Sequence, residues 1–371
     1  MRLLEIAKRK EAEGVAIVHM EIGEPDFDSP SHVIAAAQQA LHQKTMHYTP
    51  AAGLPELRTA ISDYYQRQYG ARVNPARIVV TPGASGALQL ALSVLLNPGD
   101  NILMADPSYP CNRHFVRLLE GEPISVPVGQ YTNYQLTLEQ CKAVWTGNTA
   151  GVLIASPANP TGSIISTQQL SDIANYVKEQ GAGLIVDEIY HGLTYNEQPP
   201  TALALSDDIF VVNSFSKYFG MTGWRVGWLV VPEEYADAIE KLAQNIFLAA
   251  CTLSQYAALA ALLPETQVEL NKRRDEFKKR RDFLCDAVTD LGFKIAGKPE
   301  GAFYIYANCQ QFSNNSYDFC YELLEQTGVV ITPGKDFGCY KAEHHVRFAY
   351  TTNLEQLAEG ISRLRQYLRS L

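Results

Sequence analysis

Short apolar runs alternate with helical patterns along the middle of the chain, and this alternation limits the possible folds more than any other feature. The runs are rich in Val, Ile and Leu, and helical patterns at Gly86–Leu96 and Thr167–Gln180 separate several of them. Continuously apolar strands that alternate with helices indicate a mostly parallel sheet with helices on both faces. The sequence therefore predicts an α/β fold with strands at Ile78–Thr81, Asn101–Ala105, Gly151–Ala155, Gly183–Asp187, Ile209–Asn213 and Val226–Val231.

The pattern changes near residue 265 to that of an α+β unit. The elements expected there are helices at Glu265–Asp290, Tyr317–Gln326 and about Leu354–Leu368, and strands at Phe303–Tyr306 and Val329–Thr332. A further helix is expected at Arg2–Gly14. A chain of 371 residues is too long for one compact core and suggests about two domains. We predict a large domain of residues 39–265 and a smaller α+β domain built from both chain ends, residues 1–38 and 266–371.

Composition excludes several classes of protein. The formal net charge of −9 argues against a broad nucleic-acid surface, which needs clustered Lys and Arg. No apolar run approaches the roughly 18–20 residues of a membrane span, so no membrane partner is expected. The seven cysteines are scattered and show no C-x-x-C spacing, which argues against a metal site. We therefore expect reduced thiols in a cytoplasmic protein.

Lys217 is the first candidate for chemistry. It follows the expected strand Ile209–Asn213 and lies next to Ser214 and Ser216, with Arg225 eight residues later. A lysine in this setting suits covalent capture of an aldehyde cofactor, and the hydroxyls with the planar Arg fork suit a phosphate. Taken alone, however, a lysine after a strand is more often a solvated surface residue.

Two further strand ends carry polar residues. Asp187 ends the run Gly183–Asp187, where a buried carboxylate could hold a pyridine nitrogen protonated, and Tyr190 lies three residues on. Asn159, in an Asn-Pro-x-Gly turn, could donate to a carboxylate or a phenolate. Each residue also has a plain structural reading, as an acid that caps a turn or as ordinary turn chemistry.

The remaining candidates lie in two turns and one late strand. The Gly-rich turn that holds Ala84 and Ser85 joins a strand to a helix, whose free N–H groups favour an anion. Tyr109, in a Pro-rich turn, could stack on a flat ring. Arg347 lies between Val346 and Phe348 in a strand-like stretch, so it needs an anion, either a substrate carboxylate or a structural ion-pair partner.

The order of these signals is more specific than any one of them. It reads Gly23-Glu24-Pro25-Asp26-Phe27, Tyr48 with Gly53 and Leu57-Arg58, the Gly83 turn, Pro107-x-Tyr109-Pro110, Asn159-Pro160-Thr161-Gly162, Asp187-x-x-Tyr190, Ser214-x-Ser216-Lys217 with Arg225, and Arg347. From about residue 15 to its end the chain closely resembles the class I aminotransferases of fold type I, the aspartate aminotransferase superfamily. In one respect it departs from them, because members usually carry a longer segment before the first helix.

The resemblance implies pyridoxal 5′-phosphate (PLP) as cofactor and assigns a role to each candidate. Lys217 holds the cofactor covalently, Asp187 pairs with the pyridine nitrogen, and Tyr109 stacks on the ring. Tyr190 and Asn159 contact the ring oxygen, and Arg347 grips the substrate carboxylate with help from Asn159 and the Gly23 backbone. The residues expected at the phosphate are Ala84, Ser85, Ser214, Ser216, Arg225 and, across a dimer interface, Tyr48.

The resemblance also implies the reaction. It is the transfer of an amino group from an L-amino acid to a 2-oxo acid, such as 2-oxoglutarate, by a ping-pong route in a homodimer with shared sites. Two alternatives stay open. One is a PLP-dependent carbon–sulfur β-lyase on the same scaffold, and the other is a non-catalytic regulator, although such proteins usually add a basic DNA-binding segment and none is found here.

Overall fold

The structure is a computed structural model that describes residues 2–43 and 46–370. Its main sheet has seven strands in the order β2-β8-β7-β6-β5-β3-β4. β8 runs antiparallel to both of its neighbours, and the other pairs are parallel. The strands are β2 (Ile78–Thr81), β3 (Asn101–Asp106), β4 (Glu122–Pro127), β5 (Thr149–Ala155), β6 (Gly183–Asp187), β7 (Ile209–Ser214) and β8 (Gly227–Val230). The predicted mostly parallel sheet is confirmed.

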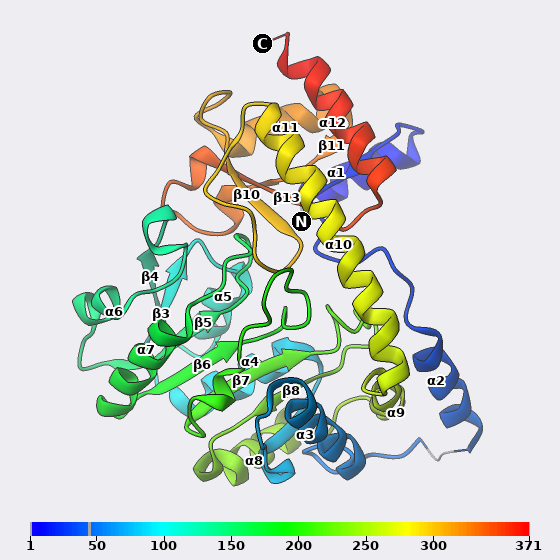
Figure 1. Cartoon of the computed structure of the whole chain (residues 1–371). Coiled ribbons are helices and arrows are strands. Elements are labelled where there is room, and N and C mark those ends of the chain that lie inside the picture. The colour runs from blue at the N-terminus through cyan, green and yellow to red at the C-terminus, as the bar shows by residue number, and fades with distance from the viewer. Residues whose placement is uncertain (1, 44–45, 371) are drawn as a thin grey trace.

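Helices lie on both faces of this sheet, also as predicted (Figure 1). The central strand β6 shows why its sequence is continuously apolar. Leu184 and Val186 belong to one buried cluster, whereas Ile185, which points the other way, belongs to the cluster on the opposite face. The helices of this part are α3 (Pro55–Tyr69), α4 (Gly83–Leu95), α5 (Pro110–Leu118), α6 (Leu138–Val144), α7 (Thr167–Glu179), α8 (Ala236–Ile246) and α9 (Thr252–Ala261).

Both ends of the chain build a second, smaller unit. Its antiparallel sheet has the order β12-β13-β10-β9, and β1 pairs in parallel with β11. The strands are β1 (Val18–His19), β9 (Lys294–Ile295), β10 (Tyr304–Asn308), β11 (Val329–Val330), β12 (Thr332–Pro333) and β13 (His345–Ala349), and the helices are α1 (Arg2–Ala12), α11 (Ser316–Thr327) and α12 (Leu354–Leu368). The N-terminal helix α1 lies beside the C-terminal elements (Figure 1).

Two strand predictions need correction. The stretch Val329–Thr332 is not one strand, because β11 pairs with β1 while β12 pairs with β13 in the other sheet. The sequence pattern also missed β4, an edge strand of the large sheet with two prolines and mostly partly exposed residues. An edge strand needs no continuous apolar run, since only one side of it is paired.

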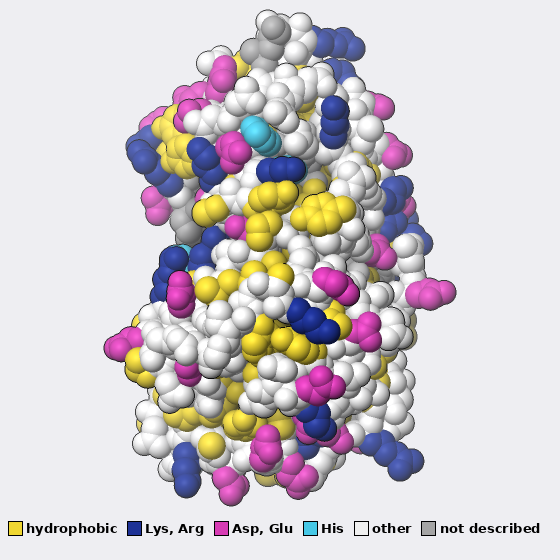
Figure 2. All heavy atoms as spheres, turned by 90° about the vertical axis from the view of Figure 1, so that its left-hand side faces the viewer, with side chains coloured by type: hydrophobic (Ala, Val, Ile, Leu, Met, Phe, Trp, Pro, Cys, Tyr) yellow, Lys and Arg dark blue, Asp and Glu magenta, His cyan; other side chains and the backbone are white. Residues whose placement is uncertain are grey.

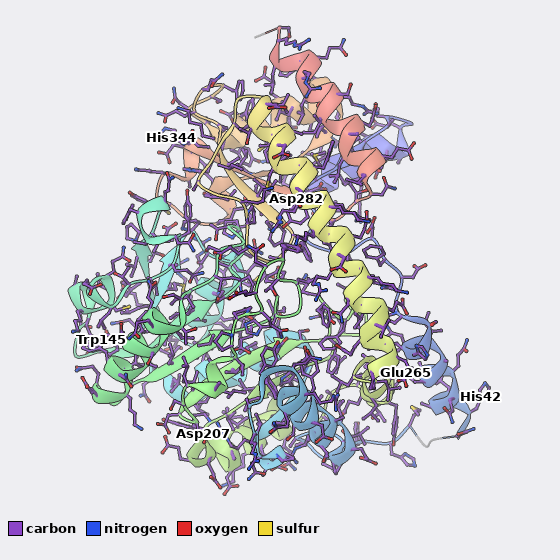
Figure 3. The ribbon with its side chains drawn as sticks, in the orientation of Figure 1. His42, Trp145, Asp207, Glu265, Asp282 and His344 are labelled. Atoms are coloured by element: carbon purple, nitrogen blue, oxygen red, sulfur yellow. The ribbon has the colours of Figure 1, made fainter. Side chains whose placement is uncertain are left out.

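The helix α10 (Pro264–Asp290) connects the two units. Glu265 lies at the end of the helix beside α9, and Asp282 lies farther along it beside the small sheet (Figure 3). The helix α2 (Ser31–Gln43) packs on α9, so the predicted domain boundary after residue 38 falls inside α2. The division of the chain into domains stays a prediction. Among the described residues, no helix is long and apolar enough to cross a membrane.

Short 3-10 helices lie in the connections, at Pro75–Arg77, Gln130–Thr132, Ala202–Ala204, Glu233–Tyr235, Gly334–Asp336 and Ala342–His344.

Candidate active site

The carboxyl ends of the parallel strands open into a cavity of about 310 Å³ between the large sheet and β10–β13. In α/β sheets this edge is where ligands bind, because the strand-to-helix turns meet there. Most residues predicted for the site line this one cavity: Gly23, Ala84, Ser85, Tyr109, Asn159, Asp187, Tyr190, Ser216, Lys217, Arg225 and Arg347. The structure thus brings together side chains that lie up to several hundred positions apart in the sequence.

Lys217 follows β7 and directs its amine into the cavity. The amine donates a hydrogen bond to the carbonyl oxygen of Gly23 at 2.7 Å and lies 5.8 Å from the centre of the Phe303 ring. Desolvation lowers the pKa of Lys217 to about 8, and the positive charges of Arg347 and Arg225 add to that effect. An amine with this pKa is free of its proton far more often than a surface lysine, so it is a competent nucleophile and base.

Asp187 is a buried carboxylate without an ion-pair partner among the described residues. One oxygen accepts a hydrogen bond from the backbone N–H of Ile189 at 3.0 Å. Desolvation raises the pKa of Asp187 to about 6, although that N–H group and the charge of Lys217 oppose the rise. A carboxylate that is ionised in such a place is stabilised by any cation placed against it.

Arg347 comes from β13 and reaches across to the large sheet. It donates hydrogen bonds to Asn159 Oδ1 at 3.0 Å and to the carbonyl oxygen of Glu21 at 2.5 Å. Its guanidinium carbon lies 4.1 Å from the ring centre of Tyr304 and 4.7 Å from that of Phe337. Its Nε atom is buried, and no described residue is its hydrogen-bond partner. The group is therefore held in place by several contacts, and no carboxylate of the described residues pairs with its positive charge.

The opposite end of the cavity is built for an anion. The helix α4 starts at Gly83 without a side-chain cap, which leaves the N–H groups of its first turn available. Arg225 donates to Ser216 Oγ at 3.4 Å, and a Cβ atom added at Gly83 would lie 2.5 Å from the Arg225 guanidinium. Only glycine at position 83 leaves room for the Arg225 guanidinium this close to the start of α4. The guanidinium and the free N–H groups of the helix therefore face the same space.

Two predicted residues lie outside the cavity lining. Ser214 is buried behind Ser216 and donates to its Oγ at 2.9 Å, so it supports the anion end from beneath. Tyr48 is 83% exposed and lies in a separate recess with Leu41, Ala250 and Cys251. Within a single chain, Tyr48 therefore does not join the other candidates.

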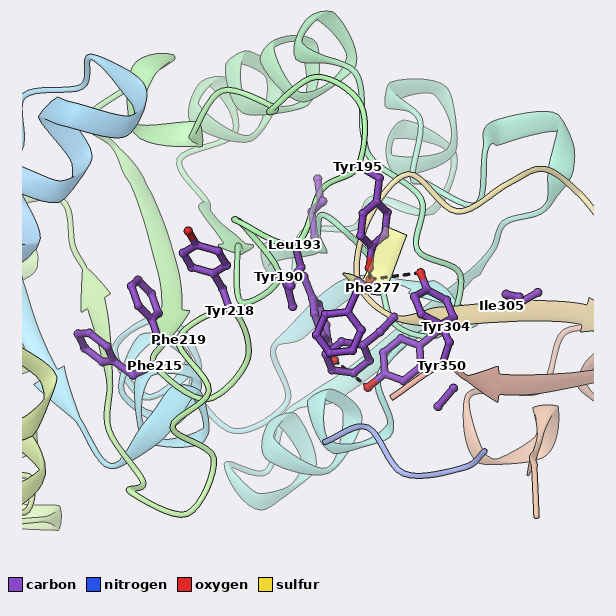
Figure 4. Packing of buried hydrophobic residues seen from close by; sticks show 14 of the residues in the cluster. Tyr190, Leu193, Tyr195, Phe215, Tyr218, Phe219, Phe277, Tyr304, Ile305 and Tyr350 are labelled. Atoms are coloured by element: carbon purple, nitrogen blue, oxygen red, sulfur yellow. Dashed lines mark hydrogen bonds between the residues drawn. The ribbon is translucent and has the colours of Figure 1, made fainter. Parts of the chain in front are cut away.

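Tyr304 is a residue of the site that sequence reasoning missed. Its hydroxyl lies 3.0 Å from the hydroxyl of Tyr190 (Figure 4). Its ring covers the guanidinium of Arg347. Tyr304 lies on β10, which pairs with the strand of Arg347. The only signal was its place in a strand-like stretch, and the pairing of β10 with β13 was not visible in the sequence. Thr222, which also lines the cavity, was missed as well.

The fold and the cavity together define a class of protein. A lysine, a buried carboxylate and an anion cradle meet at the carboxyl edge of a mostly parallel sheet, and an arginine from a smaller α+β unit faces them, as in PLP-dependent enzymes of the aminotransferase fold. Residues 15–364 match the family described as aminotransferase class I and II. The chain belongs to this family and is a PLP-dependent aminotransferase.

Individual relatives agree on the family and differ in substrate. The chain is 38% identical to the valine–pyruvate aminotransferase of Mycobacterium tuberculosis, over 99% of this chain and 95% of that protein. It is 35% identical to the (5-formylfuran-3-yl)methyl phosphate transaminase of Methanocaldococcus jannaschii, over 99% and 96%. The crystal structure of Thermus thermophilus aspartate aminotransferase with maleate superposes with a TM-score of 0.93 at 31% identity, over 100% and 96%.

Proposed function

We propose that this aminotransferase moves an amino group from an L-amino acid to a 2-oxo acid, with 2-oxoglutarate as one acceptor, by a ping-pong route. The observation that carries the proposal is the meeting of Lys217, Asp187 and Arg347 in one cavity of about 310 Å³. These three groups differ in chemistry and face a common space, as a reaction with a cofactor and a carboxylate substrate requires.

The residues of the cavity fit PLP. The start of α4, with Ala84 and Ser85, forms with Ser216 and Arg225 a cradle that suits its phosphate, which Ser214 supports from behind. The unpaired Asp187 carboxylate would hold the pyridine nitrogen protonated. We assign the ring oxygen to Tyr190 and Asn159, and the ring face to Tyr109. When bound, PLP supplies an electron-withdrawing ring that accepts the electron pair left at the substrate Cα.

The chain's own residues would then position the substrate and move its proton. Arg347 would bind the α-carboxylate through N–H groups in the plane of its guanidinium, and Asn159 and the Gly23 backbone lie beside it. Lys217, with a pKa lowered to about 8, would remove the proton from the substrate Cα as a base and then hold it as the conjugate acid for return. Tyr304 covers Arg347 and contacts Tyr190, and it would hold both side chains in position.

We further propose a homodimer with shared sites. Tyr48, Leu41 and Met46 expose large apolar side chains and line one recess. Exposed apolar residues that gather in one recess are typical of an interface between subunits. On this proposal Tyr48 reaches the phosphate end of the partner's cavity. The division into domains at residues 39–265 and 1–38 with 266–371 is part of the same proposal.

A panel of donors and acceptors tests the proposed reaction. Each L-amino acid is incubated with the holoenzyme and either 2-oxoglutarate or pyruvate, and the new amino acid and 2-oxo acid are measured together. Transamination produces the two in equal amounts and gives parallel lines in double-reciprocal plots. If a sulfur-containing amino acid is instead cleaved to ammonia and a thiol without an acceptor, the proposal is wrong and the lyase is correct.

A further inference from the structure

A second cavity lies between the two units, outside the site described above. Its volume is about 610 Å³, within the range of small-molecule sites. One wall comes from the loop after β4, residues 128–134, and the other from β9, β10 and the segment before β13. The side chain of Gln130 spans the two walls by donating to the carbonyl oxygen of Ala296 at 3.4 Å. A molecule in this cavity would therefore contact both units at once.

The charge of this cavity is opposite to that of the chain. The chain carries −9 overall, yet the described residues that line the cavity include Lys294 and Lys341 and no Asp or Glu. Two acids lie near the lining. Asp106, at the end of β3, accepts hydrogen bonds from the backbone N–H groups of Cys339 and Tyr340 at 2.9–3.2 Å, and Glu343 lies 3.7 Å from His344. Neither lysine forms an ion pair with another described residue. A positive mouth of this kind attracts an anion.

The walls are aromatic. Tyr131, Tyr134, Tyr306 and Tyr340 line the cavity. The Tyr306 ring stacks on His345 at 4.7 Å with an interplanar angle of 6°, and Tyr134 meets its edge at 6.1 Å. The Tyr306 hydroxyl is buried, and within the described part of the chain it has no hydrogen-bond partner. Such walls favour a flat ring.

The surroundings are visible on the surface of the molecule. Figure 2 shows the left-hand face of Figure 1, where hydrophobic side chains, a class that includes tyrosine, gather along the middle with charged side chains of both signs beside them. From the positive mouth and the aromatic walls we propose that this inter-unit cavity is a second ligand site, which binds a small aromatic carboxylate. The ring lies between the tyrosines and the carboxylate faces Lys294 and Lys341.

Calorimetric titration of the holoenzyme with 3-phenylpropionate tests the site. This probe has neither an amino nor an oxo group, so it cannot react. We expect saturable binding that persists in Arg347→Ala, which removes the carboxylate grip of the active site. The paired change Lys294→Gln with Lys341→Gln should weaken it by about three- to thirtyfold, the range for two partly exposed ion pairs. Added salt should weaken it too, because both lysines are exposed.

Matched controls separate the site from general attraction. Lys241→Gln with Lys272→Gln removes the same charge from exposed positions on α8 and α10, outside the cavity, and should leave the affinity unchanged. The neutral 3-phenylpropanamide and the ring-free propionate should both bind more weakly than the probe. A co-crystal structure should place the ring between the tyrosines.

Three results would overturn the proposal. They are no saturable binding in Arg347→Ala, equal losses from the two lysine pairs, and a co-crystal structure with the probe only in the active-site cavity. None of these results depends on which amino acid is the donor. The test of this second site is therefore independent of the test of the proposed reaction.

Discussion

Replacing Asp187 by asparagine should make the apoprotein more stable at neutral pH while it removes most of the activity of the holoenzyme. The structure leaves this carboxylate buried, with one backbone hydrogen bond from Ile189 and no cation paired to it. In the apoprotein its negative charge is therefore unfavourable, and only a protonated cofactor nitrogen would compensate it. An asparagine is neutral at every pH and can keep the same hydrogen bond.

The size of the effect follows from the pKa of Asp187, which burial raises from 3.8 to about 6 in the folded chain. A raised carboxyl pKa favours folding below pH 3.8, and this contribution is lost as the pH rises through 6. Ionisation of Asp187 therefore lowers the free energy of unfolding by about 0.5 kcal/mol at pH 4 and by about 3 kcal/mol at pH 7.5. The shift already includes the hydrogen bond from Ile189, so the neutral amide is comparable to the protonated acid, which accepts the same bond. The variant should therefore be about 3 kcal/mol more stable at pH 7.5 and only about 0.5 kcal/mol more stable at pH 4.

Thermal unfolding of the two apoproteins across this pH range measures the difference. For a chain of this length, about 3 kcal/mol corresponds to a rise in Tm of roughly 4 °C. With PLP bound, single-turnover kinetics should show that Asp187→Asn slows proton transfer more than Asp187→Glu does, because an amide cannot keep the ring nitrogen protonated. A stability difference that does not change with pH, or an asparagine variant with near-normal single turnovers, would refute the reasoning.

Three further predictions concern the same site. Borohydride reduction of the holoenzyme should attach the cofactor permanently to Lys217. Peptide mapping that finds the cofactor on another lysine would contradict the assignment. The variant Lys217→Ala should bind PLP without a covalent bond and lose turnover. Arg347→Ala should lower kcat/KM for amino acids by about 10- to 150-fold, since a paired arginine and carboxylate contribute roughly 1.5–3 kcal/mol, with Arg347→Lys intermediate. Amines without a carboxylate should lose little in that variant, and equal losses would instead indicate a structural arginine. Mixing the inactive Tyr48→Phe and Lys217→Ala proteins should restore part of the activity through one hybrid site, and no recovery despite subunit exchange would assign Tyr48 to its own subunit.

The central fold could be read from the sequence because its strands are buried on both faces and are therefore apolar throughout. The same reading placed Asp187 and Lys217 at the ends of adjacent strands, β6 and β7, which lie side by side in the sheet. Parallel strands end at one edge, so order along the chain was enough to predict that these residues meet. The helix α12 was likewise predicted with the bounds that it has, since its apolar face is regular.

Contacts that depend on pairing between distant strands could not be predicted from the sequence pattern. Tyr304 covers Arg347 only because β10 pairs with β13, about forty positions later in the chain. The division of Val329–Thr332 between two sheets depends on β1 from the other end of the chain. The role of Tyr48 requires a second copy of the chain, so neither the pattern nor one subunit can settle it. Local periodicity carries no information on any of these contacts.

The helix α10 has a consequence for how the whole molecule melts. Its 27 residues span about 40 Å, and Leu270 near one end and Leu284 near the other are both fully buried in one continuous apolar cluster. If either unit lost its structure alone, half of this helix would lose the packing that keeps it helical. Unfolding should therefore be cooperative across both units, and scanning calorimetry of the apoprotein should give a single endotherm. Two separate endotherms would mean that the helix breaks between Leu270 and Leu284.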